Sequence, residues 1–320
     1  MPEQKYFSEV TLGLCNESVA LLRPSDINKV RNDPMTPIHT KNAHIYAIGK
    51  RPRLSIKPNS LHQDSNYVYG VLHRHIDGER LSRDFRLART LLNPEAVNFG
   101  VSKYPHNKFL ALNSKGKEIH ILPVTLFIPH ILTPFDPWGD VEIIYIGQAF
   151  GKAGERSALD RLKDHSTLQK IQADVLSNEP DMEIVILLFN YDHPLRFSIH
   201  DGIGKPRITG EQDEQHYLRV LRTDIRYSDI TTLAEAGLIR YFQPHYNTVY
   251  KDSFPTSDMK SLQQCYDLDL LALSVELNTE DIYINTYSHK TSCREHHMTK
   301  YDLHSDAERR RFFCVEDLGE

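Results

Sequence analysis

The sequence contains few cysteines, and their spacing matches no paired arrangement. Cys15, Cys265, Cys293 and Cys314 are widely separated, and none belongs to a Cys-x-x-Cys pair. Small disulfide-linked domains and cysteine zinc ribbons both depend on closely spaced cysteines. The sequence therefore favours neither class, and we expect reduced thiols.

Long hydrophobic runs are also lacking. No apolar stretch approaches the roughly 20 residues that a helix needs to cross a bilayer. The first five residues, Met-Pro-Glu-Gln-Lys, do not have the basic and then apolar pattern of a signal peptide. We therefore expect no membrane partner and a cytoplasmic location. With 320 residues, of which 40% are hydrophobic, the chain is long enough to form more than one core.

The chain lacks the positive net charge that is typical of nucleic-acid-binding proteins, since its formal net charge is -5. This total hides an asymmetry. Residues 1–120 contain 18 Lys and Arg against 11 Asp and Glu, whereas residues 121–320 contain 20 against 32. A basic first part could attract phosphate groups, or both parts could be ordinary solvated surfaces. The charge alone leaves both interpretations open.

Short apolar runs separated by turn residues predict a β-rich recognition or sensor domain over residues 1–119. We expect strands over residues 10–14, 19–22, 44–48, 67–72, 109–112 and 118–122, the last two forming a hairpin. One helix is predicted over residues 78–92, because apolar residues recur there at spacings of three and four. Arginines recur in it every third residue, which is typical either of a solvated face or of contact with phosphates.

The middle of the chain, residues 120–252, predicts a second domain in which strands and helices alternate. Strands are expected over residues 121–128, 141–147 and 182–189, and helices from about residues 155, 211 and 230. The last helix should end before Pro244, because proline disfavours helical geometry in the residue before it. Residues 190–210 are expected to form a polar surface loop. With an acidic extension over residues 253–320, the whole chain is predicted to be an α+β protein.

Two short motifs in the middle domain contain polar residues that are common in catalytic sites. The first is Tyr145-Ile146-Gly147, which ends a predicted strand, followed by Arg161 and His165 on one face of the next helix. The second begins with Glu235-Ala236-Gly237-Leu238-Ile239 and continues to Pro244 and Asn247. Taken singly, each residue is explained better without a catalytic role: Tyr145 as a core aromatic, Glu235 as a helical surface charge, and Arg161 with His165 as surface partners of nearby carboxylates.

In this order and at these spacings, the two motifs resemble the GIY-YIG nuclease superfamily over about residues 120–250. The resemblance implies a small central antiparallel sheet flanked by helices, and metal-dependent hydrolysis of phosphodiester bonds in DNA, with RNA as the other candidate substrate. The family normally has a first motif, with its own tyrosine, shortly before Tyr-Ile-Gly. Here the candidate first strand ends near Phe127, Ile128 and His130 and contains no tyrosine.

The resemblance also implies roles for individual residues. Glu235 would hold one Mg²⁺ or Mn²⁺ ion, since a hard carboxylate suits these cations. Arg161 would contact the scissile phosphate, and Tyr145 would orient or deprotonate the attacking water. His165 would assist, and Lys152 or His130 would replace the missing tyrosine. The expected nucleic-acid contacts are Gly147, Arg156, Asn247, Lys205 and Arg207, with Asn247 also holding the backbone beside the glutamate.

The function expected from these residues is that of a DNA endonuclease of the restriction or phage-defence type. A repair or mobile-element endonuclease is the alternative within the same enzyme class. A catalytically inactive module of this fold, which binds nucleic acid or protein, is the alternative outside it. The sequence leaves open whether the protein forms a homo-oligomer.

Overall fold

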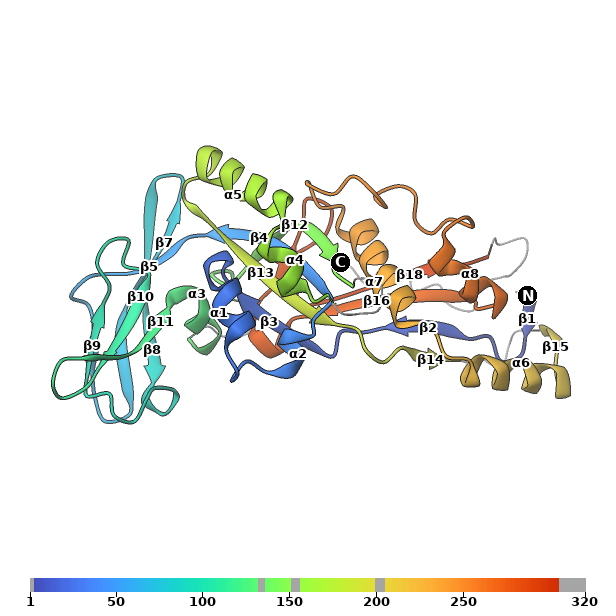
Figure 1. Cartoon of the computed structure of the whole chain (residues 1–320), viewed down its shortest axis with the longest axis horizontal. Helices are drawn as coiled ribbons and strands as arrows, with labels where there is room; N and C mark the ends of the chain where they lie inside the picture. Colours follow the sequence, from blue (N-terminus) through green and yellow to red (C-terminus); the bar gives the residue numbers. More distant parts are fainter. Residues whose placement is uncertain (1–2, 132–135, 151–155, 199–204, 305–320) are drawn as a thin grey trace.

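The computed structural model describes residues 3–131, 136–150, 156–198 and 205–304. These residues form an elongated molecule, in which a lobe made of strands lies at one end of a larger mixed body (Figure 1). The prediction of an α+β protein is confirmed. Within the described residues, no helix combines the length and the apolar character needed to cross a membrane.

A five-stranded sheet forms the centre of the body. Its strands lie in the order β17 (Thr286–Tyr287), β12 (Val141–Gln148), β4 (Ile45–Pro52), β13 (Met182–Asn190) and β3 (Ser18–Leu22). Neighbouring strands are antiparallel, apart from the short parallel pairing of β12 with β17. The strands expected in β12 and β13 are confirmed. Although β4 comes from the first part of the chain, it lies between them.

Three helices cover one face of this sheet. α1 (Ile27–Asn32), α4 (Ala158–Lys163) and α5 (Ser166–Asn178) bury their apolar residues against Tyr46, Ile48 and other side chains of the central strands. α2 (Ile38–Lys41) precedes β4. α5 packs on β13, and the first N–H of α4, that of Ala158, donates to the Ala43 carbonyl just before β4.

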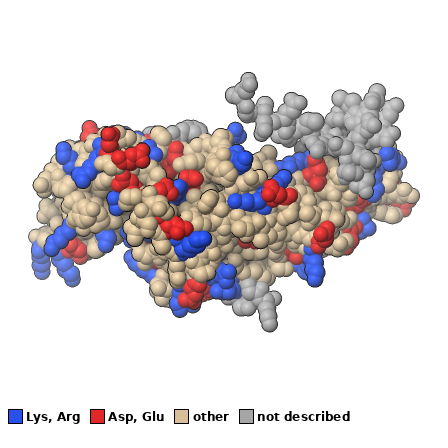
Figure 2. All heavy atoms as spheres, turned by 90° about the horizontal axis from the view of Figure 1, so that it is seen from above, with Lys and Arg blue, Asp and Glu red and all other residues tan. Residues whose placement is uncertain are grey.

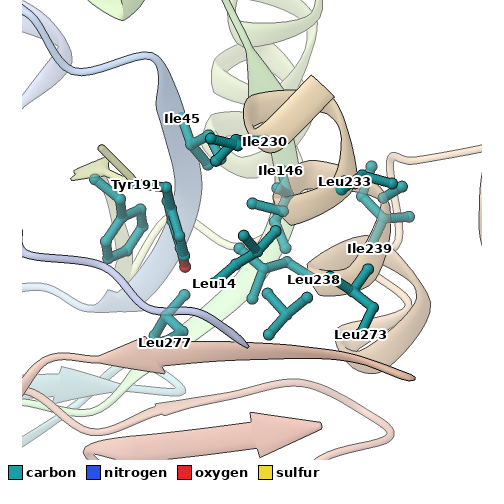
Figure 3. Close-up of a cluster of buried hydrophobic side chains, with 14 of the residues drawn as sticks. Leu14, Ile45, Ile146, Tyr191, Ile230, Leu233, Leu238, Ile239, Leu273 and Leu277 are labelled. Atoms are coloured by element: carbon teal, nitrogen blue, oxygen red, sulfur yellow. The ribbon is translucent and has the colours of Figure 1, made fainter. Parts of the chain in front are cut away.

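α7 (Tyr227–Phe242) covers the opposite face and is buried between two sheets. The second sheet has the order β14 (Leu195–Phe197), β2 (Thr11–Leu14), β16 (Ala272–Asn278) and β18 (His296–Asp302). Figure 3 shows the resulting core, in which side chains of α7 lie between those of the central strands and those of β2 and β16. The predicted helix that ends before Pro244 is confirmed.

The remaining elements of the body lie at the end opposite the strand-built lobe (Figure 1). α6 (Glu211–Arg222) and α8 (Lys260–Asp267) pack there, beside the two-stranded sheet of β1 (Glu3–Tyr6) and β15 (Lys205–Ile208). The helix expected from about residue 211 is confirmed. The segment 190–210, expected to be a loop, contributes the strands β14 and β15.

Residues 53–131, which we call the β lobe, form a separate core. Seven strands build it: β5 (Leu54–Ile56), β6 (His62–Gln63), β7 (Tyr67–Ile76), β8 (Glu79–Ala88), β9 (Asn98–Val101), β10 (Lys108–Leu112) and β11 (Glu118–Pro123). β7 pairs with β5, β6 and β8, and β10 pairs with β9 and β11. A short helix, α3 (Val124–Phe127), ends the lobe's strands and leads back to the body. The lobe is therefore inserted in the chain between β4 and β12.

Two predictions for the β lobe are wrong. Residues 78–92, predicted as a helix, form β8 and a 3-10 turn (Arg89–Leu91), because β8 pairs along its whole length with β7. Asp77 and Gly78, with φ angles of 51° and 79°, make the two-residue hairpin turn between the two strands. The strand predicted over residues 121–128 ends at Pro123, and helix α3 follows it.

The three segments predicted from the sequence interleave in the body. The central sheet takes β3 and β4 from residues 1–119, β12 and β13 from residues 120–252, and β17 from residues 253–320. Thr125 of the β lobe is hydrogen-bonded to an ion pair of this sheet. Its Oγ1 donates to Glu183 Oε2 at 2.9 Å, its carbonyl accepts from Arg51 Nη2 at 3.3 Å, and Arg51 Nε lies 2.8 Å from Glu183 Oε1. Arg51 is only 1% exposed, so this contact fixes the lobe against the body.

Candidate active site

Tyr145 of β12 lies opposite a second tyrosine, Tyr46 of β4. Tyr46 pairs across the strands with Gly147, two residues beyond Tyr145. The ring centroids of the two tyrosines are 6.2 Å apart, and their planes are inclined by 35°. Tyr46 was not among the predicted site residues, because the first tyrosine was expected shortly before Tyr145 in sequence. The signal was present in the strand predicted over residues 44–48.

Two local features place both tyrosines on the helix-covered face of the sheet. The register of β12 shifts between Ile143 and Tyr145, so that the consecutive residues Ile144 and Tyr145 both pack on this face. Regular alternation would have turned Tyr145 to the other side. Gly147 supplies the space: a Cβ atom there would lie 2.7 Å from Tyr46 Oη and 2.8 Å from Tyr145 Cε1. Any side chain at this position would therefore displace the tyrosines.

His165 fixes the hydroxyl of Tyr46. It is 3% exposed, and its Nδ1 accepts a hydrogen bond from the Leu168 N–H at 3.0 Å. This bond assigns the proton of the neutral imidazole to Nε2, which lies 3.0 Å from Tyr46 Oη and donates to it. Burial, together with the positive charges of Arg161 and Arg156, lowers the pKa of His165 to about 4. The imidazole is thus neutral at pH 7.

The prediction that Arg161 and His165 share one helix is wrong. α4 ends at Lys163, and His165 is the N-cap residue of α5. Both side chains nevertheless lie at the tyrosine pair. Arg161 is exposed, and its guanidinium is close enough to oppose the rise in pKa of Tyr46 and of Tyr145. Arg161 hydrogen-bonds to Tyr46, and its exposure lets its other N–H groups meet an anion from solvent.

Both tyrosines are neutral at physiological pH. Burial, with a smaller contribution from Tyr145, raises the pKa of Tyr46 well above its ordinary value. Burial and the negative charge of Glu235 raise the pKa of Tyr145, while hydrogen bonding from Tyr46 and the charge of Arg161 oppose this rise. Tyr46 is 1% exposed, whereas Tyr145 is half-buried. Tyr145 is therefore the member of the pair that a water molecule can reach.

Glu235 approaches the tyrosines from α7, around the edge of the sheet. β17 pairs with β12 only at Val141 and Glu142, so β12 is an edge strand near Tyr145. The carboxylate of Glu235 is half-buried. Burial raises the pKa of Glu235 to about 7, while hydrogen bonds from Gln148 and the charge of Arg161 oppose the rise. Near neutral pH this carboxylate therefore exchanges readily between its two protonation states.

Asn247 holds the edge of β12 in place. Its Oδ1 accepts from the Ile146 N–H at 2.9 Å, and its Nδ2 donates to the Ile146 carbonyl at 2.8 Å. The neighbouring Tyr246 N–H donates to the Ile144 carbonyl at 3.0 Å. The backbone groups of Ile144 and Ile146, before and after Tyr145, thus form the hydrogen bonds that a neighbouring strand would otherwise provide. The amide of Asn247 is thus used within the protein, in the backbone-holding role expected for it.

The donor set at Glu235 fits a loosely held hard cation. Across the part of the chain that is described, no group of three or more His, Cys, Asp or Glu side chains gathers at one point. A Mg²⁺ ion needs no such group, because it usually keeps several waters and takes one or two carboxylates together with substrate phosphates. A carboxylate whose charge is disfavoured by burial gains from a neutralising cation. Glu235 therefore fits Mg²⁺ or Mn²⁺ as the one protein carboxylate of a hydrated ion.

Two of the predicted nucleic-acid contacts lie far from this site. Lys205 and Arg207 belong to β15, which pairs with β1 at the end of the molecule opposite the β lobe, whereas β12 lies near the middle (Figure 1). The exposed Arg207 can therefore contact only a distant part of a long ligand. The structure does not bring these two residues together with Tyr145.

The candidates for replacing the missing tyrosine have different positions. His130 is exposed at the end of a 3-10 turn (Ile128–His130) that follows α3. Lys152 lies outside the described residues. Arg156, by contrast, is half-buried beside His165, whose pKa its charge helps to lower. Tyr46, which was not one of the two expected candidates, lies opposite Tyr145.

The site thus combines a tyrosine pair, an exposed arginine, a neutral histidine and a carboxylate of raised pKa. No family model, curated protein or solved structure matches the chain. The chemistry of the site must therefore be argued from its own residues. An arginine and a carboxylate on either side of neutral hydroxyl groups are suited to an anionic substrate, a cation and an oriented water.

Proposed function

We propose that the protein is a metal-dependent endonuclease that hydrolyses phosphodiester bonds in DNA. The observation that carries this proposal is the Tyr46–Tyr145 pair, with Arg161, His165 and Glu235 around it. The GIY-YIG resemblance requires a tyrosine on a strand beside Tyr-Ile-Gly, and β4 supplies one. In this proposal the nuclease unit is assembled from β4 and from residues 140–250, with the β lobe inserted between its first two strands.

Arg161 provides the phosphate contact in the proposed reaction. Its guanidinium is exposed, so that the substrate can reach it, yet it lies beside the half-buried hydroxyl of Tyr145. A guanidinium never loses its charge near neutral pH, and it can bind two oxygens of one phosphate. It therefore stabilises the additional negative charge of the pentacoordinate phosphorus.

Tyr145 orients the attacking water. Because its hydroxyl is neutral at pH 7, its oxygen can accept a hydrogen bond from water without first losing a proton. His165 donates to the oxygen of Tyr46, which leaves the proton of Tyr46 available for Tyr145. The oriented water loses one proton to solvent as its oxygen forms the new P–O bond, and the departing sugar oxygen takes up a proton from solvent as its bond to phosphorus breaks. A Mg²⁺ or Mn²⁺ ion held by Glu235 would supply a Lewis acid for the phosphate.

The inserted β lobe suits a nuclease that selects its target, such as a restriction or phage-defence enzyme. A repair or mobile-element endonuclease would use the same site, and RNA is the alternative substrate. Cleavage of supercoiled plasmid DNA in Mg²⁺ or Mn²⁺, compared with EDTA, tests the proposal. We expect nicked or linear product only with the cation.

Two substitutions connect this cleavage to the site. Glu235→Gln and Arg161→Ala should each reduce the cleavage rate by about 100-fold or more, with unchanged circular dichroism. Glu214→Gln and Arg222→Ala alter exposed residues of the distant α6, serve as matched controls and should cleave normally. Full activity of a folded Glu235→Gln variant would remove the proposed metal site. Salt-dependent binding without cleavage of DNA or RNA would indicate an inactive binding module.

A further inference from the structure

The β7–β8 hairpin of the β lobe presents an aromatic and cationic surface to solvent. Along β7, Val68 and Leu72 point into the core of the lobe, and the alternate residues point outward. We call the outward surface the lobe face, which is made by His62, Tyr67, Tyr69, His73, Arg80 and Arg86. Cross-strand pairing places Tyr69 between His62 of β6 and Arg86 of β8. On the same face, Val71 and the exposed Asp84 lie between the Tyr69–Arg86 pair and the residues His73 and Arg80.

The rings of the lobe face form a fixed platform. His62 and Tyr69 are stacked, with centroids 5.0 Å apart and planes inclined by 12°, and Tyr67 lies 6.1 Å from Tyr69. The hydroxyl of Tyr69 donates to Asp64 at 2.7 Å, and Asp64 also accepts the Tyr67 N–H at 2.8 Å. Rings that are already held in this way lose little conformational freedom when a flat ligand stacks on them.

The arginines of the lobe face lie on either side of Asp84 along β8 without an ion pair among the described residues, unlike the arginine on the other side of the sheet. Arg83, which points inward from β8, pairs with Asp136 at 2.6 Å and lies over the Trp138 ring at 5.1 Å. Arg80 and Arg86 are exposed, and within the described ranges neither forms an ion pair. Arg86 instead lies over the ring of Tyr67 at 5.2 Å. Its charge is therefore available beside the aromatic platform.

The β lobe is basic, whereas the rest of the chain is acidic. Residues 53–131 contain 11 Lys and Arg against 6 Asp and Glu, and the remaining residues contain 27 against 37. Figure 2 shows Lys and Arg side chains projecting from the end of the molecule that the lobe forms, with a group of Asp and Glu nearer the middle. A polyanion is therefore attracted to the lobe more than to the body.

We infer that the lobe face binds a single-stranded segment of nucleic acid, with bases stacked on Tyr67 and Tyr69 and phosphates contacting Arg80 and Arg86. Stacking platforms beside unpaired cations are how sheets commonly bind single strands, since every base has a flat face. An acidic peptide would meet the arginines but would leave the rings unused. The inference rests on the proposed nuclease only for what happens to the bound strand, because binding itself needs no cleavage.

Fluorescence anisotropy with a short labelled oligonucleotide tests this inference. The measurement is made in EDTA, with the oligonucleotide either single-stranded or hybridised to its complement. We expect the full-length protein to bind the single strand more tightly. The Arg80→Glu, Arg86→Glu double variant should weaken this binding by about tenfold or more, and should reduce the salt slope by roughly 1.4, for two lost phosphate contacts. The same reversal at Arg219 and Arg222 of α6 is the matched control and should change neither quantity.

The aromatic contribution is tested separately. Tyr69→Ala should weaken single-strand binding by about 5- to 150-fold, while Tyr69→Phe, which keeps the ring and loses only the bond to Asp64, should bind nearly as well as the original protein. Unchanged binding in the double arginine variant, equal losses in the α6 control, or equal binding of a poly-glutamate peptide would each overturn the inference. Binding that depends on this face without any cleavage would leave the inference standing and remove the nuclease proposal. Cleavage that persists without such binding would leave the nuclease proposal standing and overturn the inference about the lobe face.

Discussion

At the scale of single residues, the carboxyl group of Glu235 links the site to the stability of the fold. Burial raises its pKa to about 7, from an ordinary value of 4.5. Between these two pH values the folded protein holds a proton that the unfolded chain has lost. The stability that comes from this proton is fully present below pH 4.5 and is lost as the pH rises through 7.

Replacing Glu235 by Gln should therefore stabilise the protein at high pH. At pH 8 the variant should have a free energy of unfolding about 1 to 3 kcal/mol larger than the original protein, and at pH 4 the difference should vanish. Urea unfolding at the two pH values measures this change. Mg²⁺ should raise the stability of the original protein at pH 8 and leave the variant unchanged. A pH-independent difference between the two proteins would contradict the raised pKa.

At the scale of secondary-structure elements, His165 connects the start of α5 to the tyrosine pair. Its Nδ1 caps the helix, and its Nε2 holds Tyr46. Asparagine can replace the first function but not the second, because a short amide side chain caps a helix well and does not reach as far as an imidazole. The two functions of His165 are therefore separable by substitution.

We expect His165→Asn to keep most of the stability and to lose most of the cleavage activity. His165→Ala should lose both, with a free energy of unfolding lower by about 1 kcal/mol or more because the cap is also removed. Thermal unfolding and plasmid cleavage, measured on both variants, check this expectation. Equal activity of the Asn variant and the original protein would show that the contact of His165 with Tyr46 is not needed.

Elements with a clear apolar pattern of their own were predicted well, whether or not their partners are close in sequence. The apolar spacing before Pro244 predicted α7, and continuous apolar runs predicted β12 and β13. β8 was predicted wrongly as part of a helix, because Leu81, Phe85, Ala88 and Leu92 recur at spacings of three and four. The pairing partner β7 decided the outcome, and the Asp77-Gly78 turn between them was the local sign of a hairpin that was overlooked. The break between α4 and α5 likewise follows from the cap at His165, which periodicity does not reveal.

At the scale of the whole molecule, the candidate site depends on strands that are distant in the chain. Tyr145, Arg161 and Glu235 were predicted, because each lies in a motif with its own spacing. Tyr46 was not, since the entire β lobe separates it from Tyr145 in sequence. A local sequence pattern does not predict which strands will pair. The rings of Tyr46 and Tyr145 come together only through the register of β4 against β12.

The candidate site is also connected to the β lobe, through the buried contact between Arg51 and Glu183. This contact joins β4, which carries Tyr46, to β13 at the point where the chain leaves for the β lobe. Removing one partner of a buried ion pair destabilises the protein, because the other charge remains buried and unpaired. Thr125 of the lobe is hydrogen-bonded to both Arg51 and Glu183, so the lobe is attached to the strand that carries Tyr46.

The cleavage rate of a Tyr46→Phe variant tests the central claim most directly. This substitution keeps the buried ring and removes the hydroxyl that meets His165 at 3.0 Å. Tyr191→Phe is a matched control, because Tyr191 is also buried and its hydroxyl donates to the Glu276 carbonyl at 2.7 Å, outside the site. We predict that metal-dependent plasmid cleavage falls by about 100-fold in Tyr46→Phe and is kept in Tyr191→Phe, with both proteins folded. Full cleavage by a folded Tyr46→Phe variant would contradict the account.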